Sequence, residues 1–360
     1  MKPLRVLALT RYGELGASSR LRFIQYFPAL QVAGIQVKLL PLFDDVALTA
    51  KYQLGQYGAI MTLDAYAQRI KAMFDRHAFD LLWIEKEALP WCPLWLESFL
   101  MRGLPFVLDY DDAVFHNYDL HRLGIVRQLY GTRLDRLMAN AKLVVCGNAY
   151  LAQRAINSGA SWVEQLPTVI DLNRYPIKPA QVPIGDSDLP RVVWIGSPST
   201  VKYLELLGQS LQALSIRKPF VLRVIGAHFV LPTVQIECMQ WSENTEVAAI
   251  SGCAVGVMPL LDSAWERGKC GYKLIQYMGC SMPVVASDVG VNAEIVHCGV
   301  NGFLANSADE WVDAMLKILN DAYLRHHMGK AGRQRVEEIY CIQKTGPVMA
   351  KWLKRAAVNH

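Results

Sequence analysis

The same short pattern occurs twice in this chain: an apolar run, a loop that contains glycine, and an apolar helical segment. The first copy spans residues 4–30, and its helical part covers Leu21–Leu30. The second copy spans residues 192–214, and its helical part covers Val201–Leu214. A buried strand that leads through a short loop into a helix is the opening of a doubly wound parallel α/β sheet. Two such openings in one chain predict two wound domains.

A proline-rich stretch separates the two copies. Residues 166–190 contain five prolines and the turn-forming run GDSD, which is typical of a linker. The length of 360 residues also exceeds what one core usually organises. We therefore expect a first domain at residues 1–170, a linker at 171–190, a second domain at 191–345 and a last helix within 346–360. Other strand-like runs occur at Val37–Leu40, Leu81–Ile84, Phe106–Leu108, Leu143–Cys146, Val221–Ile225 and Val255–Met258.

The composition is that of a well-buried globular protein. Hydrophobic residues make up 52% and charged residues 19%, which argues against disorder. The net charge of +5 comes without dense Lys/Arg blocks, so nucleic acid is not expected as the main partner. The eight cysteines form no CxxC pair, as expected for reduced thiols in a cytoplasmic protein. The strand-like start leaves no room for a signal peptide, and no apolar run is long enough to predict a membrane span.

A helical pattern that begins at Gly271 has one apolar face, formed by residues 274, 275 and 278. Lys273 and Gln276 need not lie on that face, so we expect them to be free to face a ligand. The N-terminus of such a helix offers unpaired N–H groups to a phosphate near Cys270 and Gly271.

A buried strand pattern, PVVAS, follows the helical pattern after a turn of small residues. The order of helix, small-residue turn, PVVAS, GVNAEIV and GVNGFL closely resembles the donor-binding signature of retaining GT-B glycosyltransferases of family four. The resemblance covers most of the chain and is densest over residues 192–304. It implies two Rossmann-like domains that face a cleft, with the acceptor bound by the first and a nucleotide-diphosphate sugar by the second. It also implies transfer of a hexose with retention of configuration, no required metal, and a last helix that crosses back to the first domain.

The chain departs from this family at its charged donor contacts. The usual pair of glutamates eight positions apart would fall at Gly268 and Gln276, although a glutamine can still hydrogen-bond sugar hydroxyls. Ser197 stands where an arginine is usual, so we expect Lys269 and Lys273 to supply part of the missing charge. Ser199 or Thr200 is expected to cap the following helix. The donor contacts that the resemblance implies are Gly196, Ser197, Ser199, Lys202, Lys269, Cys270, Gly271, Tyr272, Lys273 and Gln276.

Three carboxylates, Asp109, Asp111 and Asp112, follow one another at the end of a predicted strand. Such crowding raises at least one pKa unless a cation lies near, and it marks a candidate for chemistry. The resembled family often has a histidine and an aspartate at this strand end, and Asp111 and Asp112 occupy the matching positions as candidate catalytic residues. Two alternatives stay open: the acids cap the next helix and bind its arginines, or Asp109 and Asp111 form a DxD metal site. The metal site belongs to GT-A enzymes, whose fold would leave the C-terminal signature unexplained.

The first glycine loop is the candidate acceptor loop. Its two glycines allow close approach of backbone to a ligand, Ser18 or Ser19 is a candidate N-cap, and Arg20 and Arg22 can pair with an anion. A plain connection with solvated arginines explains the segment equally well. The acceptor candidates are Gly13, Gly16, Ser19 and Arg20.

A basic amphipathic stretch at His121–Lys142 has two interpretations. It is a core helix with a solvated face, which we favour, or a helix that lies on an anionic membrane. Family habits suggest a saccharide or lipid-linked acceptor and a role in polysaccharide or glycolipid synthesis, in the cytoplasm or at the inner face of its membrane. A sugar-nucleotide epimerase and a non-catalytic scaffold are the alternative functions.

Overall fold

The computed structural model describes residues 2–177 and 189–358, which form two compact units. The first unit holds the described residues of 1–168, 268–270 and 342–360, and the second those of 169–267 and 271–341. Most of the stretch predicted as the linker, residues 178–188, lies outside the described residues. Within the described part of the chain, each helix is too short or too polar to cross a membrane.

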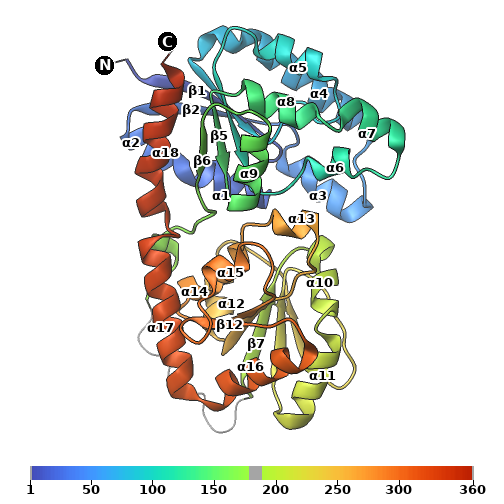
Figure 1. The fold of residues 1–360 in the computed structure, drawn as a ribbon, viewed down its shortest axis with the longest axis vertical. Helices are drawn as coiled ribbons and strands as arrows, with labels where there is room; N and C mark the ends of the chain where they lie inside the picture. Colours follow the sequence, from blue (N-terminus) through green and yellow to red (C-terminus); the bar gives the residue numbers. More distant parts are fainter. Residues whose placement is uncertain (1, 178–188, 359–360) are drawn as a thin grey trace. The chain divides into compact units, whose positions relative to one another are not determined.

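The first unit contains a six-stranded sheet with the order β2-β1-β3-β4-β5-β6, and every strand pair is parallel (Figure 1). The chain begins in the sheet interior, adds β2 on one side and then extends the other side from β3 to β6. The strand order therefore reverses between β1 and β3, the place where doubly wound sheets bind ligands. The strands are β1 (Leu4–Thr10), β2 (Ile35–Pro41), β3 (Leu81–Glu85), β4 (Phe106–Tyr110), β5 (Leu143–Cys146) and β6 (Val163–Gln165).

Helices cover both faces of this sheet. The last helix, α18, packs against α2, β3 and β4 (Figure 1), and its Thr345 hydroxyl lies 3.0 Å from the hydroxyl of Tyr26. The helices are α1 (Ala17–Arg22), α2 (Phe27–Val32), α3 (Asp45–Leu54), α4 (Ala59–Phe74), α5 (Leu94–Met101), α6 (His116–Asp119), α7 (Gly124–Tyr130), α8 (Arg133–Asn140), α9 (Ala149–Asn157) and α18 (Ile342–Ala357).

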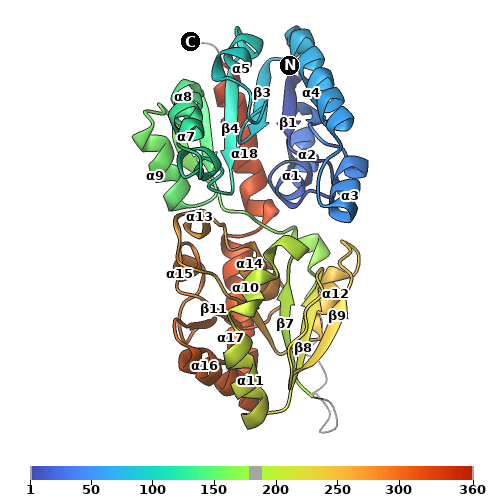
Figure 2. The ribbon, with the colours of Figure 1, turned by 90° about the vertical axis from the view of Figure 1, so that its right-hand side faces the viewer.

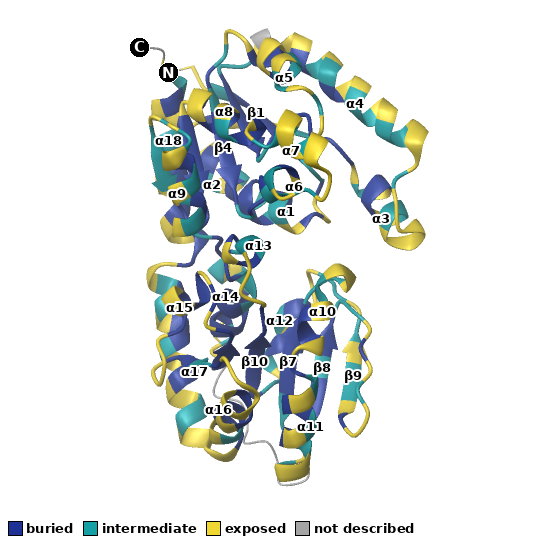
Figure 3. Cartoon of the chain, turned by 45° about the vertical axis from the view of Figure 1, so that its right-hand side comes forward, coloured by how far each residue is buried: buried dark blue, intermediate teal, exposed yellow. Residues whose placement is uncertain are grey.

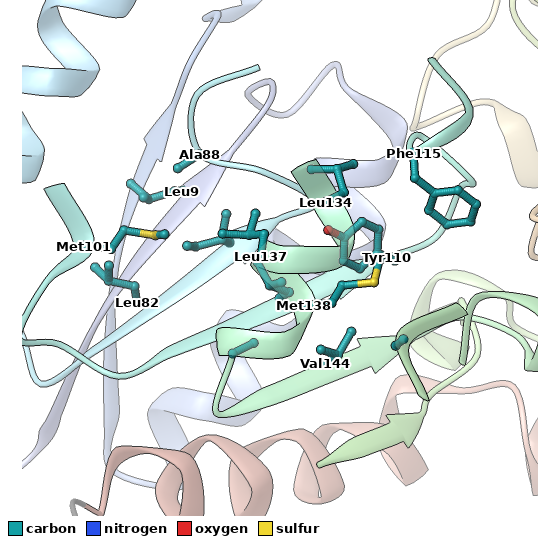
Figure 4. Close-up of a cluster of buried hydrophobic side chains, with 14 of the residues drawn as sticks. Leu9, Leu82, Ala88, Met101, Tyr110, Phe115, Leu134, Leu137, Met138 and Val144 are labelled. Atoms are coloured by element: carbon teal, nitrogen blue, oxygen red, sulfur yellow. The ribbon is translucent and has the colours of Figure 1, made fainter. Parts of the chain in front are cut away.

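The core of the first unit forms where α8 packs on the sheet. Figure 4 shows Leu134, Leu137 and Met138 of α8 beside Tyr110 and Val144 of the strands, and all five side chains are fully buried. Burial of apolar surface is the main favourable term in folding. The packing of these side chains therefore holds β4, and with it the start of the following loop, in place.

The second unit contains another parallel six-stranded sheet, with the order β12-β11-β10-β7-β8-β9. Figure 2 shows β7, β8 and β9 side by side. Here the order reverses between β7 and β10. The strands are β7 (Arg191–Ile195), β8 (Val221–Ile225), β9 (Gln235–Met239), β10 (Val255–Met258), β11 (Val284–Ala286) and β12 (Gly302–Leu304).

The residues of β7 alternate between two cores, as the period of two in a strand requires. Val193 and Ile195 pack in the cluster that holds α14, whereas Val192 and Trp194 pack in the cluster that holds α11 and α16. Both predicted wound domains are thus confirmed as α/β units. The helices are α10 (Lys202–Glu205), α11 (Gly208–Arg217), α12 (Glu246–Ser251), α13 (Ala264–Arg267), α14 (Tyr272–Gly279), α15 (Asn292–Ile295), α16 (Ala308–Asn320) and α17 (Ala322–Glu338).

Three predicted helices are wrong in extent because each is interrupted. Leu21–Leu30 contains the end of α1, a 3-10 turn at Ile24–Tyr26 and most of α2, where Pro28 lies in the first turn. Val201–Leu214 divides into α10 and α11. His121–Lys142 divides into α7 and α8 at residues 131–132, and only α8 contributes buried residues.

Candidate active site

In the first unit, the loops after β1, β3 and β4 meet at one edge of the sheet because these strands are neighbours and parallel. The loop after β3 begins with Lys86, which adopts a left-handed backbone conformation with φ of 64°. That conformation is uncommon for a residue with a side chain and indicates a local constraint. The loop after β4 carries the predicted catalytic residues Asp111 and Asp112.

Lys86 is the centre of a charge cluster. Its Nζ lies 2.8 Å from Asp111 Oδ1, 3.7 Å from Glu85 Oε1 and 3.9 Å from Asp112 Oδ2. It also donates to Ser18 Oγ over 3.3 Å. Burial disfavours the ammonium form, but the surrounding carboxylates, Asp111 first, raise the pKa of Lys86 above its ordinary value. Lys86 therefore stays charged and supplies the cation that the run of acids requires.

The three acids of this run have three different environments. Asp109 is buried and accepts from Arg22 Nε over 2.7 Å, and burial raises its pKa to about 6 despite that partner. For Asp111, burial is outweighed by Lys86, which lowers the pKa. For Asp112, burial and the neighbouring Asp111 raise the pKa, while Lys269 opposes the rise. Asp112 is the most exposed of the three, with 30% of its side chain accessible.

The segment 268–270 completes the cluster in the first unit. Lys269 Nζ lies 3.7 Å from Asp112 Oδ1, and its carbonyl oxygen accepts from Asn148 Nδ2 over 2.9 Å. The buried Cys270 donates its Sγ–H to the carbonyl oxygen of Asp111 over 3.1 Å, and burial raises the pKa of its thiol. Two predicted donor contacts, Lys269 and Cys270, thus lie beside the two predicted catalytic residues.

The acids do not cap the following helix or bind its arginines. They pair with Arg22 and with Lys86 and Lys269 rather than with arginines of the following helix. The two carboxylates of the DxD interpretation, Asp109 and Asp111, each have a cationic partner of their own. Among the described residues, no group of three His, Cys, Asp or Glu side chains is arranged to hold a metal ion.

A pocket of about 300 Å³ lies beside the cluster. Its walls come from the loops after β1, β3 and β4 and from α1 and α3, and they include Arg11, Tyr12, Tyr52, Lys86, Glu87 and Asp112. It lies where the strand order of the sheet reverses. Sequence reasoning missed Arg11 and Lys86. The signal for Lys86 was the charged run EKE, which begins at the last residue of a fully buried strand.

The first glycine loop is tied to this edge by Ser19, which donates to Glu85 Oε2 over 2.6 Å and accepts from Tyr12 N. The predicted N-cap role of Ser18 or Ser19 is wrong, because α1 begins earlier and Gly16 is its N-cap. A Cβ at Gly16 would lie 2.3 Å from Tyr12 Cβ, so this position has no room for a side chain.

The arginines of this loop do not both face an anion site. Arg22 is fully buried and pairs with Asp109, so its predicted role in binding an external anion is wrong. Arg20 NH1 donates to the carbonyl oxygen of Glu14 over 2.8 Å at the surface, and Gly13 lies against Asp45. Neither Gly13 nor Arg20 lines the pocket, whereas Gly16 does.

In the second unit, the predicted donor loop follows β7 at the reversal of strand order. Ser197 Oγ lies 2.9 Å from Ser199 Oγ, and a Cβ at Gly196 would clash with Trp194 at 2.5 Å. Thr200 donates to the carbonyl oxygen of Ser197 instead of capping α10, whose N-cap Val201 has no side-chain bond, so the predicted cap is wrong. Lys202 is exposed, with its Nζ 5.2 Å from the ring centre of Tyr203.

The helix α14 begins where the sequence predicted a helix N-terminus. Gly271 is the N-cap with φ of 64°, followed by the half-buried Tyr272. Lys273 Nζ lies 4.6 Å from the ring centre of Trp194 and so projects toward the sheet edge that carries the Gly196 loop.

Gln276 is not free to face a ligand, so that prediction is wrong. Its side chain is buried, and its amide donates to Glu246 Oε2 over 3.3 Å and to Tyr175 Oη over 3.4 Å. Glu246 in turn accepts from Trp241 Nε1 over 2.8 Å. Gln276 therefore belongs to a buried polar network that joins α12 to α14.

Comparison with known proteins agrees with this architecture. Residues 189–321 match the family described as Glycosyl transferases group 1. Over 66 residues the chain is 36% identical to an uncharacterized glycosyltransferase of Methanocaldococcus jannaschii, a match that covers 18% of this chain and 19% of that relative. The chain thus matches about a fifth of the length of this curated relative.

Solved structures resemble almost the whole chain. HepE of Anabaena in complex with UDP has a TM-score of 0.70 at 16% identity, and the match covers 98% of this chain and 100% of HepE. Sucrose-phosphate synthase of Thermosynechococcus elongatus has a TM-score of 0.69 at 16% identity, with 99% of each chain covered. A glycosyltransferase of Rickettsia africae has a TM-score of 0.71 at 12% identity, with 100% of each chain covered. The predicted GT-B fold is confirmed.

Proposed function

We propose that this chain, whose residues 189–321 carry a group 1 glycosyltransferase domain on a GT-B fold, transfers a hexose from a nucleotide-diphosphate sugar to an acceptor hydroxyl. The observation that carries the proposal is the family match over the second unit together with full-length similarity to HepE, which was solved with UDP and with UDP-glucose. We assign the donor to the second unit and the acceptor to the first.

The donor diphosphate is assigned to the N-terminus of α14. Its first backbone N–H groups have no partner within the helix and favour an anion, and Lys273 adds a cation one turn in. Charge that develops on the leaving diphosphate is stabilised by such fixed donors. The role predicted for Lys269 changes, because this lysine pairs with Asp112 in the first unit.

The acceptor hydroxyl is assigned to Asp112. A carboxylate that is partly exposed, and whose pKa burial has raised, accepts a proton more readily than an ordinary aspartate. Asp111 positions Lys86, which holds the cluster together. In this proposal the reaction retains the anomeric configuration and needs no metal.

The test of the donor site is binding followed by transfer. A panel of nucleotide sugars is screened by the rise in melting temperature that a ligand of the folded state produces, and UDP and uridine are then compared by calorimetry. Lys273→Met should weaken UDP binding by about ten- to hundredfold and uridine binding much less, since a charged hydrogen bond is lost. Lys330→Met, an exposed position on α17, is the matched control.

The remaining outcomes separate the alternatives. Transfer to an acceptor, followed by NMR of the new anomeric proton, tests retention. An epimerised nucleotide sugar formed without acceptor would instead indicate the epimerase. If the protein binds no nucleotide sugar of the panel and transfers no sugar, the result would indicate a non-catalytic scaffold.

We further propose that the acceptor is saccharide or lipid-linked and is met at an anionic membrane surface. The support is α7, which has no buried residue although its sequence, GIVRQLY, is largely apolar (Figure 3). Ile125 and Leu129 are 59% and 68% exposed, and the exposed Arg122 and Arg127 lie close to them in the sequence. Exposed apolar side chains among cations are the features of an interfacial helix. A role in polysaccharide or glycolipid synthesis fits such an acceptor.

A further inference from the structure

The pocket beside Lys86 and Asp112 contains a cation that the proposed reaction does not use. Arg11 follows β1 and Lys86 follows β3, so both lie where the strand order reverses. Lys86 is occupied by Asp111 at 2.8 Å. The partners of the other charged groups in the pocket show which charged group can still bind a ligand.

The three carboxylates of the pocket already have partners. Glu85 Oε2 accepts from Ser19 Oγ over 2.6 Å and from the backbone N–H of Arg11 over 2.8 Å. Glu87 accepts from the hydroxyl of Tyr118 over 2.8 Å and is paired with Arg133. Asp112 is shared between Lys86 and Lys269.

Arg11 has no such carboxylate. Across the described residues, its half-buried guanidinium has no carboxylate oxygen within 4.0 Å, and its side-chain hydrogen bond is to Tyr12. A second cation lies near Tyr12, since Lys51 Nζ is 4.9 Å from the ring centre of Tyr57 and 6.0 Å from that of Tyr12. Burial opposes ionisation of Tyr12, yet Arg11 and Lys51 lower its pKa. This wall of the pocket is therefore electropositive.

We propose that the pocket binds an acidic saccharide, whose carboxylate or phosphate pairs with Arg11. A guanidinium offers parallel donors that match either anion. Tyr12 and Tyr52 line the pocket, and aromatic side chains pack well against the apolar side of a sugar. A volume of about 300 Å³ admits one sugar ring. Asp112 lines the same pocket, so a hydroxyl of that ring can reach it. That this saccharide is the acceptor rests on the proposed function. That the pocket binds an acidic saccharide does not.

The experiment compares three probes on the full chain by saturation-transfer NMR titration: methyl glucuronide, glucose 6-phosphate and the neutral methyl glucoside. At low salt, at least one acidic probe should bind about ten- to hundredfold more tightly than the glucoside. Arg11→Gln should abolish that preference and leave glucoside binding unchanged. Arg136→Gln, an exposed arginine of α8, is the matched control and should keep the preference.

Each outcome decides the proposal. The acidic probe that is preferred identifies carboxylate or phosphate as the anion. Equal binding of all three probes, or a preference that survives Arg11→Gln, would overturn the proposal. If Arg11→Gln fails to fold, Arg11→Lys and the loss of the wild-type preference at high salt replace it. UDP binding, measured separately, reports on the donor site and so distinguishes failure here from failure of the proposed function.

Discussion

Lys86 gives the two neighbouring carboxylates Asp111 and Asp112 different properties. It lies 2.8 Å from one and 3.9 Å from the other, so Asp111 is held ionised while the pKa of Asp112 is raised. A single cation placed unequally between two acids thus shifts their pKa values in opposite directions, and in the proposed function this separates a structural carboxylate from a reactive one.

Substitution of the two acids by asparagine should therefore have different effects. Asp112→Asn should reduce turnover by at least about a hundredfold with little change in melting temperature or in UDP affinity. Asp111→Asn should instead destabilise the protein by about 3 kcal/mol, because it leaves a buried ammonium without its closest partner. Turnover and urea unfolding of both variants check this, and a stable, fully active Asp112→Asn would contradict it.

The pH dependence of turnover should be controlled by the same residue. Asp112 acts in its ionised form, so activity is lost as the pH falls through a pKa that lies above the ordinary value of 3.8. Lys269 favours the ionised form, and Lys269→Met should therefore move the acidic limb of the pH profile to higher pH. The profile of kcat/KM measures this shift, with Lys330→Met as control. If the acidic limb stays in place or moves to lower pH, Lys269 does not act on Asp112.

The sequence predicted the acids of this site but not their partners. Asp111 and Asp112 stand out because three carboxylates occur within four residues. Lys86 is distant in sequence and becomes their neighbour only through the pairing of β3 with β4. Gln276 was misplaced for a related reason: a period of 3.6 residues predicts one buried face of α14, whereas α12 covers a second.

At the scale of elements, α7 stands apart from the helices around it. Trp91, itself 46% exposed, lies 6.4 Å from Tyr130 of α7 between ring centres and extends the same apolar surface. Neighbouring α8 buries Leu134, Leu137 and Met138. The core-helix interpretation of His121–Lys142 therefore holds for α8, while α7 keeps its apolar residues at the surface.

Binding to anionic vesicles tests this surface. The wild type should sediment with phosphatidylglycerol vesicles at low salt and be released as salt screens Arg122 and Arg127. Replacing Ile125 and Leu129 together by asparagine should weaken binding at least about tenfold, since two exposed apolar side chains can no longer insert. Ile216→Asn, at a residue that is 85% exposed in the second unit, is the control. Binding that is unchanged in the double variant would exclude α7 as the contact.

Strands with continuous apolar runs were predicted almost exactly, whereas an edge strand without such a run was not. The predicted Leu143–Cys146 and Val221–Ile225 coincide with β5 and β8, which are interior strands of their sheets. The edge strand β9, Gln235–Met239, was missed because none of its residues is buried and its sequence, QIECM, has no continuous apolar run. The interruptions of the three predicted helices were missed because apolar residues continue on both sides of each break.

At the scale of the whole molecule, α18 connects the end of the described chain to the first sheet. Leu353 and Met349 are fully buried, and α18 packs against β3 and β4, the strands that carry Lys86 and Asp112 at their ends. The stability of the candidate site therefore depends on residues more than two hundred positions away in the sequence.

Truncation of one buried side chain on α18 should be costly. Leu353→Ala should lower the free energy of unfolding by about 2 to 5 kcal/mol, the usual range for a fully buried leucine. Lys354→Ala, at the next and exposed position, should change it little. Urea unfolding followed by tryptophan fluorescence measures both, and equal effects of the two substitutions would show that α18 contributes no packing.

This arrangement has a consequence for synthesis on the ribosome. The strands of the first sheet emerge early, but the helix that covers β3 and β4 emerges only after the whole second unit has been translated. Until then, the apolar surface on which Leu353 will pack is open to water and to other nascent chains. The second unit can complete its own fold during that interval. A chaperone that binds exposed apolar strands would therefore be needed earliest and longest by the first unit.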